Sequence, residues 1–342
     1  MAIEEAKTSI VAPSVIPEDA SLDATLRPSR LADFIGQRQM KESLSIFLKA
    51  AQQRGESLEH VLLAGPPGLG KTSLAHIVAR ELGTNIRITA GPVLTKVADL
   101  AAVLTSLQPG DVLFIDEIHR LNRAIEEVLY PAMESFALDL VVGQGPGAKT
   151  LRIDLPQFTL IGATTRAGML GSPLRDRFGM TYRFSFYDKG EMQEIVRRSA
   201  RLLELTIDDP SLTAIASRCR RTPRIANRLL KRVRDYAQVQ GHGQITADVV
   251  EETLALLEVD RLGLDASDRR ILQVMIEKFN GGPVGLQTLA ATSAEEEQTL
   301  EEVIEPFLLQ LGLIERTPRG REVTTAGFEH IGSLEEAQME SN

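Results

Sequence analysis

The feature that most constrains this 342-residue chain is a glycine-rich loop that follows a short apolar run at 61–64. The loop, Gly65-Pro-Pro-Gly-Leu-Gly-Lys-Thr72, satisfies the G-x-x-x-x-G-K-[ST] phosphate-loop pattern. An apolar helical pattern follows the loop and ends at Gly83. Such a loop turns backbone N–H groups toward an anion, and the positive end of the following helix adds to the attraction. A plain glycine-rich turn is the alternative, but pattern and flanks together favour a nucleotide-binding site.

Two acidic residues further along the chain fit the chemistry of this loop. Asp116 and Glu117 end an apolar run at 112–115, which we expect to be a fully buried parallel strand. Lys71 can reach the β- and γ-phosphates of ATP, while the Thr72 hydroxyl and the Asp116 carboxylate can ligate Mg²⁺. Glu117 can then orient or deprotonate the attacking water. ATP and Mg²⁺ are therefore the expected cofactors, and the alternative is a surface acidic pair at a strand end.

Four further polar groups are candidates for the same site. Thr165 follows the strand predicted at 158–163, so its hydroxyl can contact the γ-phosphate or the water, although a solvated strand end is the default. His119 completes an Asp-Glu-x-His run, for which structural and chemical roles both stay open. Arg177 lies either on a solvated face or in an arginine finger for a neighbouring subunit, which is worth about 10³–10⁵ in rate. Arg224 opens a helix and is placed to reach a bound nucleotide, whereas most of the basic run around it is expected to be a solvated face.

The order of predicted elements divides the chain into four parts. Residues 1–25 carry five acidic side chains without a signal-peptide layout and are expected to be a disordered tail. Residues 26–187 alternate strands with helices, which predicts an α/β core with a doubly wound parallel sheet and ligands at the carboxyl ends of its strands. Residues 188–258 show three or four helical patterns and no convincing strand, so a small all-helical domain is expected. Residues 259–342 read as three helices and a hairpin around Pro318-Arg319-Gly320, the pattern of a winged helix.

Three local features of the α/β core carry specific expectations. A helical pattern at 31–47 is broken early by Gly36. Pro131 is expected to kink or end the helix predicted at 122–135. Two short strands flank a glycine-rich tip at 143–147, which predicts a protruding hairpin.

Composition limits the class of protein. No apolar run approaches the ~18 residues needed to span a bilayer, and the single cysteine, Cys219, fits a reducing cytoplasm. The formal net charge of −9 argues against a nucleic-acid partner only if charge is spread evenly. From residue 261 onward the chain holds seven basic and fifteen acidic residues, so almost all of the acidic excess lies in its last quarter. Charge therefore has to be judged patch by patch.

The motifs together resemble the AAA+ ATPases, and finer features resemble the RuvB family of bacterial Holliday-junction branch-migration motors. The similarity covers residues 26–332, and its C-terminal motifs are specific to that family rather than to AAA+ proteins at large. The segments that carry it are Gly65–Thr72, Asp116–Leu121, Gly162–Gly168, Ser172–Gly179, Gly281–Leu286 and Arg316–Arg321.

The resemblance implies a hexameric ring that encircles duplex DNA, is loaded by RuvA and works with the junction resolvase RuvC. Arg177 would be a finger presented to the adjacent subunit, and Arg316 and Arg321 would contact DNA. The hairpin at 137–154 would dock RuvA. The implied nucleotide contacts are Leu26, Arg27, Gly68, Gly70, Lys71, Thr72, Ser73, Glu134, Ser135, Phe136, Tyr187 and Arg224.

Two residues depart from the family pattern. Arg221 stands where relatives usually have glycine before Thr-Pro-Arg, so the turn in the small domain is expected to differ. Glu297 occupies a place that can be basic in relatives, which puts one DNA contact in doubt.

Two other functions compete with the motor. A nucleotide-switched DNA-binding regulator would have the same core and winged helix but would need neither Glu117 nor Arg177. A clamp-loader-like ATPase would not explain the C-terminal winged-helix motifs. The sequence therefore favours an ATP-driven DNA motor.

Overall fold

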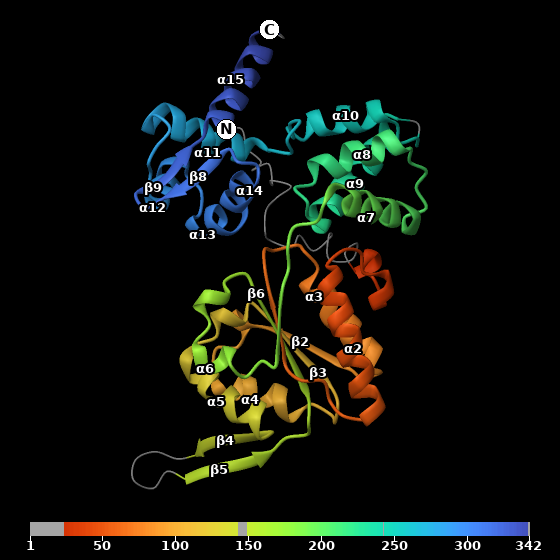
Figure 1. Cartoon of the computed structure of the whole chain (residues 1–342), viewed down its shortest axis with the longest axis vertical. Coiled ribbons are helices and arrows are strands. Elements are labelled where there is room, and N and C mark those ends of the chain that lie inside the picture. Colours follow the sequence, from red (N-terminus) through yellow and green to blue (C-terminus); the bar gives the residue numbers. More distant parts are fainter. Residues whose placement is uncertain (1–23, 143–148, 242, 341–342) are drawn as a thin grey trace, which may run out of the picture. The chain divides into compact units, whose positions relative to one another are not determined.

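The computed structural model describes residues 24–142, 149–241 and 243–340. The chain divides into two compact units, one formed by Arg27–Phe186 and the other by the residues from Tyr187 onward together with Leu26 (Figure 1). Among the residues described, no helix is both long and apolar enough to cross a membrane.

The first unit is built on a five-stranded sheet in which every neighbouring pair is parallel. Its order is β2-β3-β6-β1-β7, so β6 lies between β1 and β3. The phosphate loop follows β1, and therefore opens beside the carboxyl ends of β6 and β3. The strands are β1 (Val61–Ala64), β2 (Ile86–Ala90), β3 (Val112–Asp116), β6 (Thr159–Thr164) and β7 (Met180–Arg183).

Helices cover both faces of this sheet, as a doubly wound fold requires (Figure 1). α2 (Arg38–Arg54) and α3 (Lys71–Leu82) lie on one side, and α4 (Val97–Thr105), α5 (Arg123–Glu134) and α6 (Ser172–Arg175) lie on the other. Leucine and isoleucine side chains of α4 and α5 form one buried cluster with β3. The predicted fold class of this unit is confirmed.

Two local predictions concern a glycine and a proline of the first unit. The helical pattern at 31–47 is a 3₁₀ turn, Leu31–Asp33, followed by α2, so the early break at Gly36 is confirmed. Pro131 does not end α5, which continues to Glu134. The buried side chains of Ala132 and Met133 explain why the helix continues, because their packing offsets the one backbone hydrogen bond that proline removes.

A two-stranded antiparallel hairpin projects from the end of α5 (Figure 1). Its strands are β4 (Ala137–Val142) and β5 (Lys149–Asp154), paired from Ala137 with Asp154 to Val142 with Lys149. The predicted hairpin is confirmed in its strands, whereas its glycine-rich tip lies outside the described residues.

The second unit begins with a helical lid and continues into a winged helix. The lid helices are α7 (Lys189–Leu202), α8 (Asp209–Arg218), α9 (Pro223–Val239) and α10 (Ala247–Leu256). The winged helix consists of α11 (Ala266–Phe279), α12 (Leu286–Ser293), α13 (Glu297–Thr299), a π turn at Leu300–Ile304, α14 (Glu305–Gln310), β8 (Ile314–Thr317), β9 (Gly320–Val323) and α15 (Thr325–Glu340). The predicted helical domain and the three-helix-plus-hairpin pattern are both confirmed. The long terminal helix α15 was not predicted.

Candidate nucleotide and DNA sites

The phosphate loop has the backbone that its sequence predicts. Gly65, Gly68 and Gly70 have φ angles of 147°, 78° and 102°, in the region that favours glycine. A Cβ atom on Gly65 would lie 2.8 Å from the carbonyl oxygen of Phe184, so only glycine fits there. Lys71 is the first residue of α3, and its Nζ donates to the carbonyl oxygens of Gly65 at 2.7 Å and Pro66 at 2.8 Å. The ammonium group therefore lies within the turn of the loop.

The two acidic residues stand at the carboxyl end of β3. Asp116 is the last residue of the strand, and its Oδ1 accepts a hydrogen bond from the Glu117 amide at 3.0 Å. Glu117 has a φ angle of 47°, which turns the chain sharply after the strand. The strand register places Thr164 of β6 beside Ala64 of β1. β6 also pairs with β3. The strands that lead to the carboxylates and to the threonines are therefore neighbours, and their carboxyl ends lie where the phosphate loop opens.

The Glu117 carboxylate is held by side chains from two loops. Its Oε2 accepts a hydrogen bond from Thr165 Oγ1 at 3.2 Å and lies 3.2 Å from His119 Nδ1. The same His119 nitrogen lies 2.9 Å from Thr164 Oγ1, and the His119 side chain is only 3% exposed. The structure therefore brings together Glu117, His119 and Thr165, and gives His119 a positioning contact with the predicted base.

Arg177 lies against α5 of its own unit. Its Nη2 is 3.0 Å from Glu134 Oε1, and its Nη1 donates to the Pro173 carbonyl at 2.6 Å. The guanidinium carbon also lies 4.5 Å from the centre of the Tyr130 ring. Arg177, the predicted arginine finger, is thus paired within one chain with Glu134, a predicted nucleotide contact.

The segment after α5 is anchored by a buried histidine. His60 Nδ1 accepts from the Leu160 amide at 2.9 Å, so its protonated Nε2 donates to the Met133 carbonyl at 3.0 Å. The Phe136 ring lies edge-on to His60, with ring centres 6.2 Å apart. Ser135 Oγ donates to the carbonyl of Pro131 at 3.0 Å. Ser135 and Phe136, which were predicted to contact the nucleotide, are therefore held by contacts within the first unit.

Three other residues that were predicted to contact the bound nucleotide belong to the second unit. Leu26 and Tyr187 are each 2% exposed. The Leu26 carbonyl accepts from Arg198 of α7 at 2.7 Å, and the Tyr187 amide donates to the Arg221 carbonyl at 3.3 Å. Arg224 is the second residue of α9. The remaining predicted contacts, Arg27, Gly68, Gly70, Thr72 and Ser73, belong to the first unit with Lys71.

The two predicted DNA-binding arginines are paired across the β8–β9 hairpin, hereafter the wing. Arg316 stands directly opposite Arg321 in the strand register. Both donate to Glu305, a side chain that is 1% exposed and that sequence reasoning missed. The Arg316 side chain is 54% exposed and that of Arg321 is 17% exposed.

Comparisons with known proteins match the whole of this architecture. Three family models cover the chain in order: "Holliday junction DNA helicase RuvB P-loop domain" over 26–184, "RuvB AAA lid domain" over 187–260, and "RuvB C-terminal winged helix domain" over 261–332. The chain belongs to the RuvB family. It is 58% identical over 329 residues to the Holliday junction branch migration complex subunit RuvB of Dehalococcoides mccartyi, which covers 96% of this chain and 94% of that one.

Solved structures agree with the assignment to the RuvB family. The Thermotoga maritima RuvB Holliday junction branch migration motor is 54% identical and superposes with a TM-score of 0.83, covering 90% of this chain and 98% of that one. The ORC2 protein of Aeropyrum pernix superposes with a TM-score of 0.53 at 15% identity, covering 87% of this chain and 93% of that one. The second likeness concerns the fold alone.

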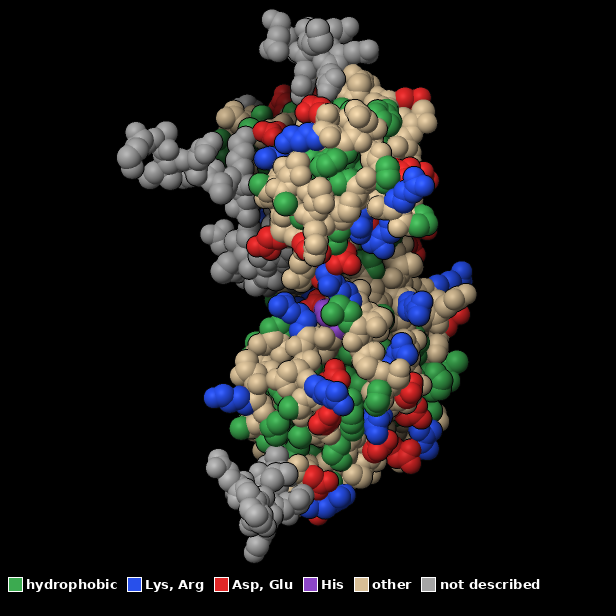
Figure 2. All heavy atoms as spheres, turned by 90° about the vertical axis from the view of Figure 1, so that its left-hand side faces the viewer, with side chains coloured by type: hydrophobic (Ala, Val, Ile, Leu, Met, Phe, Trp, Pro, Cys, Tyr) green, Lys and Arg blue, Asp and Glu red, His purple; other side chains and the backbone are tan. Residues whose placement is uncertain are grey.

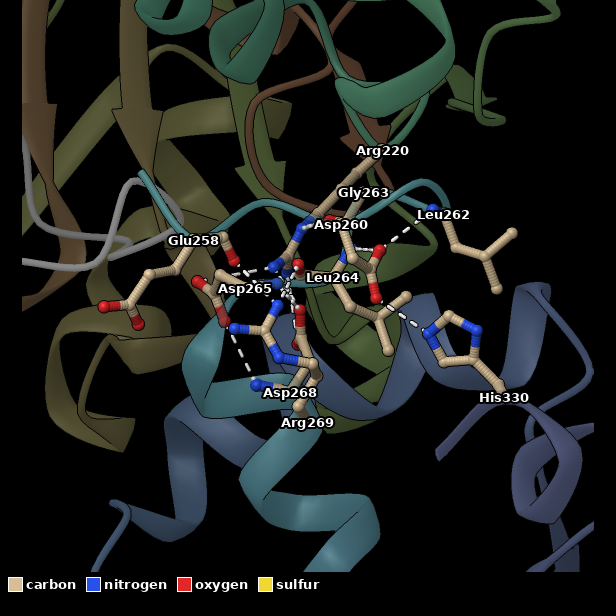
Figure 3. Close-up of polar contacts among 10 residues, drawn as sticks. All are labelled: Arg220, Glu258, Asp260, Leu262, Gly263, Leu264, Asp265, Asp268, Arg269 and His330. Atoms are coloured by element: carbon tan, nitrogen blue, oxygen red, sulfur yellow. Dashed lines mark hydrogen bonds and ion pairs between the residues drawn. The ribbon is translucent and has the colours of Figure 1, made fainter. Parts of the chain in front are cut away.

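The winged helix is fastened to the lid by four buried side chains, Arg220, Asp265, Asp268 and Phe307, here called the Arg220 cluster. Figure 3 shows the first three of them. Arg220 donates through Nη1 and Nη2 to Asp268, and its Nη2 lies 3.4 Å from Asp265 Oδ2. Its Nε donates to the Gly263 carbonyl at 3.1 Å, and its guanidinium carbon lies 4.7 Å from the centre of the Phe307 ring. Burial raises the pKa of Asp268 to about 7, with Arg220 opposing this shift and Asp265 adding to it.

The segment 258–264, which joins the lid to the winged helix, is held by two more side chains that Figure 3 shows. Arg269 Nη1 donates to the carbonyls of Glu258 at 2.7 Å and Leu264 at 3.1 Å. His330 Nε2 of α15 lies 2.7 Å from Asp260 Oδ2. Both ends of this segment are thus held by side chains.

The turn that holds Arg221 has a left-handed backbone. Arg220 and Arg221 have φ angles of 54° and 52°, both in the left-handed region. Glycine adopts this region at little cost, whereas other residues do so at about 1–2 kcal/mol each. Arg221 therefore adopts a backbone conformation that glycine would favour, and the expectation that this turn differs from that of relatives stays a prediction.

Proposed function

We propose that this chain is an ATP-driven motor that moves Holliday junctions along DNA. The observation that carries the proposal is the placement of Glu117 beside Asp116 at the sheet edge where the phosphate loop opens, with Thr165 and His119 holding its carboxylate. A protein that only binds ATP needs no positioned base at that place. The same chain carries a winged helix, which supplies a DNA-binding module.

The nucleotide site is proposed to work with ATP and Mg²⁺. The Thr72 hydroxyl and the Asp116 carboxylate are oxygen ligands of the kind that Mg²⁺ prefers, and they would hold the ion. Once bound, the ion would neutralise charge on the β- and γ-phosphate oxygens. Lys71 adds a positive charge, and Glu117 accepts the proton of the attacking water.

Hydrolysis is proposed to involve the neighbouring subunit of a hexameric ring. Arg177 would leave Glu134 and serve as the finger for the adjacent nucleotide, because its present contacts are a surface ion pair, a carbonyl and one aromatic ring. The proposed contacts of the nucleotide are Leu26, Arg27, Gly68, Gly70, Lys71, Thr72, Ser73, Glu134, Ser135, Phe136, Tyr187 and Arg224.

The partners follow from the same proposal. Arg316 and Arg321 would contact DNA phosphates, since a motor that passes through any sequence cannot depend on base edges. The hairpin at 137–154 would dock RuvA, and its exposed Leu151 offers an apolar contact. RuvC would join a larger complex, and the site of action would be the cytoplasm. We assign 26–187, 188–258 and 259–342 as the ATPase core, the lid and the winged-helix domain.

The experiment that tests the catalytic assignment compares two variants. Glu117→Gln should bind ATP normally and lose hydrolysis by about 100-fold or more, because the metal ligand and the phosphate loop stay in place while the base is removed. Lys71→Ala should instead lose ATP binding. Near wild-type turnover by Glu117→Gln, measured as phosphate release, would contradict the assignment and favour a nucleotide-switched regulator.

A further inference from the structure

The wing sets two like charges directly against each other. Arg316 of β8 is the cross-strand partner of Arg321 of β9. Like charges in that relation normally destabilise a two-stranded sheet. The Arg321 backbone is also fixed, since its amide donates to the Val284 carbonyl at 2.9 Å and its carbonyl accepts from the Val284 amide at 3.0 Å. The hairpin therefore cannot relieve the repulsion by a change of register.

Glu305 compensates for the repulsion by accepting hydrogen bonds from both guanidinium groups. Its Oε1 accepts from Arg316 Nε at 2.5 Å and from Arg321 Nε at 3.0 Å, and its Oε2 accepts from Arg321 Nη2 at 3.1 Å. Burial alone would raise the pKa of Glu305, but the hydrogen bonds from the two arginines outweigh it and hold this pKa below its ordinary value. The carboxylate therefore stays charged between the two arginines.

The backbone before Glu305 departs from a regular α-helix and helps to orient this side chain. A π turn at Leu300–Ile304 ends directly before it. Such a turn adds one residue to a helix and is frequent at functional sites. Leu300 and Ile304 are buried in the winged-helix core together with Phe307 of α14. Glu305 is thus held by neighbours that cannot rotate into solvent.

We propose that Glu305 is a positioning residue for DNA binding, which fixes Arg316 and Arg321 in the orientation that meets the phosphate backbone. The proposal rests on the proposed DNA contact of these two arginines. Arg316 gives Nε to Glu305 and remains half exposed, so its terminal N–H groups are available to a phosphate oxygen. Arg321 gives two N–H groups and is mostly covered, so it acts mainly as the fixed partner.

A purely electrostatic role for Glu305 predicts the opposite result from a positioning role. DNA is an anion, so removing an acidic side chain from a binding surface should strengthen its attraction to DNA. If Glu305 positions the arginines, removing its charge should weaken binding even though the protein becomes more positive. The sign of the change in affinity therefore separates the two roles.

The test measures binding of the full chain to duplex DNA over a range of salt concentrations. For each phosphate interaction that no longer forms, Glu305→Gln should weaken binding by about fivefold at about 0.15 M salt and should reduce the slope of log affinity against log salt by about 0.9. Glu329→Gln on α15 is the matched control, because it is exposed and changes the net charge equally. Unchanged or tighter binding by a folded Glu305→Gln variant would overturn the proposal.

Two further variants make the result decisive. Glu305→Asp keeps the charge but shortens the side chain by one methylene group, so it should weaken binding in the same direction. If thermal unfolding shows that Glu305→Gln does not fold, the Glu305→Asp variant takes its place in the test. Wild-type DNA binding by this aspartate variant would then refute the positioning role. The double variant Arg316→Ala, Arg321→Ala tests the underlying DNA contact. If it binds DNA normally, the proposed DNA contact fails and the positioning proposal fails with it. If it binds weakly while both Glu305 variants bind normally, only the positioning proposal fails.

Discussion

Arg221 shows how a single residue can keep a backbone conformation that its type disfavours. Its φ angle of 52° means that glycine should be better than alanine here, the reverse of the usual order. Arg221→Gly is expected to raise the free energy of unfolding by up to about 1 kcal/mol, because the relief of strain exceeds the entropy that glycine adds to the unfolded chain. Arg221→Ala is the control, since it removes the same side chain without relieving the backbone. If the glycine variant were no more stable than the alanine variant, the left-handed turn would carry no cost.

His60 gives the core unit a predictable response to acid. Burial lowers the pKa of its ring below the ordinary 6.5, although the Met133 carbonyl and Glu59 partly oppose the shift. Below about pH 6.5, His60 therefore binds a proton in the unfolded chain, whereas in the folded chain it stays neutral until a lower pH. The contribution of neutral His60 to the free energy of unfolding is fully present above that pH. It should fall as pH drops below it, by at most about 1.4 kcal/mol per pH unit.

The variant His60→Gln isolates this contribution. Its thermal unfolding midpoint should depend less on pH between about 5 and 7 than that of the wild type, because the titrating ring is gone. Equal pH dependence in the two proteins would show that the ring is not responsible. The variant is expected to be less stable at neutral pH, since the hydrogen bonds to Leu160 and Met133 change.

At the scale of elements, α14 touches both the lid and the wing. Phe307 lies under the Arg220 guanidinium, and Glu305 holds the wing arginines. Arg220→Ala should destabilise the attachment of the winged helix by about 3–5 kcal/mol, because it removes the cation and the hydrogen-bond donors that the buried Asp265 and Asp268 side chains share. Hydrogen exchange of the α11 amides in the full chain measures this cost.

Two comparisons show whether the cost comes from buried charge. Adding Asp268→Asn to the Arg220→Ala variant should recover part of the stability, since a buried asparagine needs neither a cation nor the proton that Asp268 would have to bind. Arg218→Ala is the control, because its partner Glu251 is 53% exposed and the pair should be worth at most about 1 kcal/mol. Similar effects of the two arginine variants would mean that the Arg220 cluster does not fasten the domain.

The elements that sequence reasoning found are those with strong local patterns. β1, β3 and β6 are continuous buried runs followed by functional residues, and all three are present. β7 was missed because it pairs only with β1 at the edge of the sheet, and of its four residues only Met180 is buried. α15 was missed because Ile331 is its one large apolar side chain that is buried among those described.

The candidate site was predictable where contacts are local and was not where they are distant. Glu117, Asp116 and Lys71 follow from motif and spacing. Glu305 does not, because its partners lie 11 and 16 residues away and a glutamate at the start of a helix normally faces solvent. Arg220 was grouped with the solvated basic run, since nothing local indicates that it pairs with Asp268, 48 residues later.

At the scale of the whole molecule, net charge is a poor guide to the DNA partner. Basic and acidic side chains are interspersed over the face that Figure 2 shows. The acidic excess of the last quarter coexists with a wing in which two arginines share the Glu305 carboxylate, so these three side chains carry one positive charge while Glu315 and Glu322 face each other beside them. DNA binding is therefore expected to depend on positioned groups rather than on a general attraction.

Dissociation of a synthetic four-way DNA junction by the full chain with RuvA tests whether ATP hydrolysis moves a junction. The wild type should convert the junction to duplex products with ATP and Mg²⁺, but not with a non-hydrolysable ATP analogue. Glu117→Gln should bind both ATP and the junction and yield no product. If ATP changed only the affinity for DNA, or if Glu117→Gln dissociated junctions at the wild-type rate, the chain would not be the motor proposed.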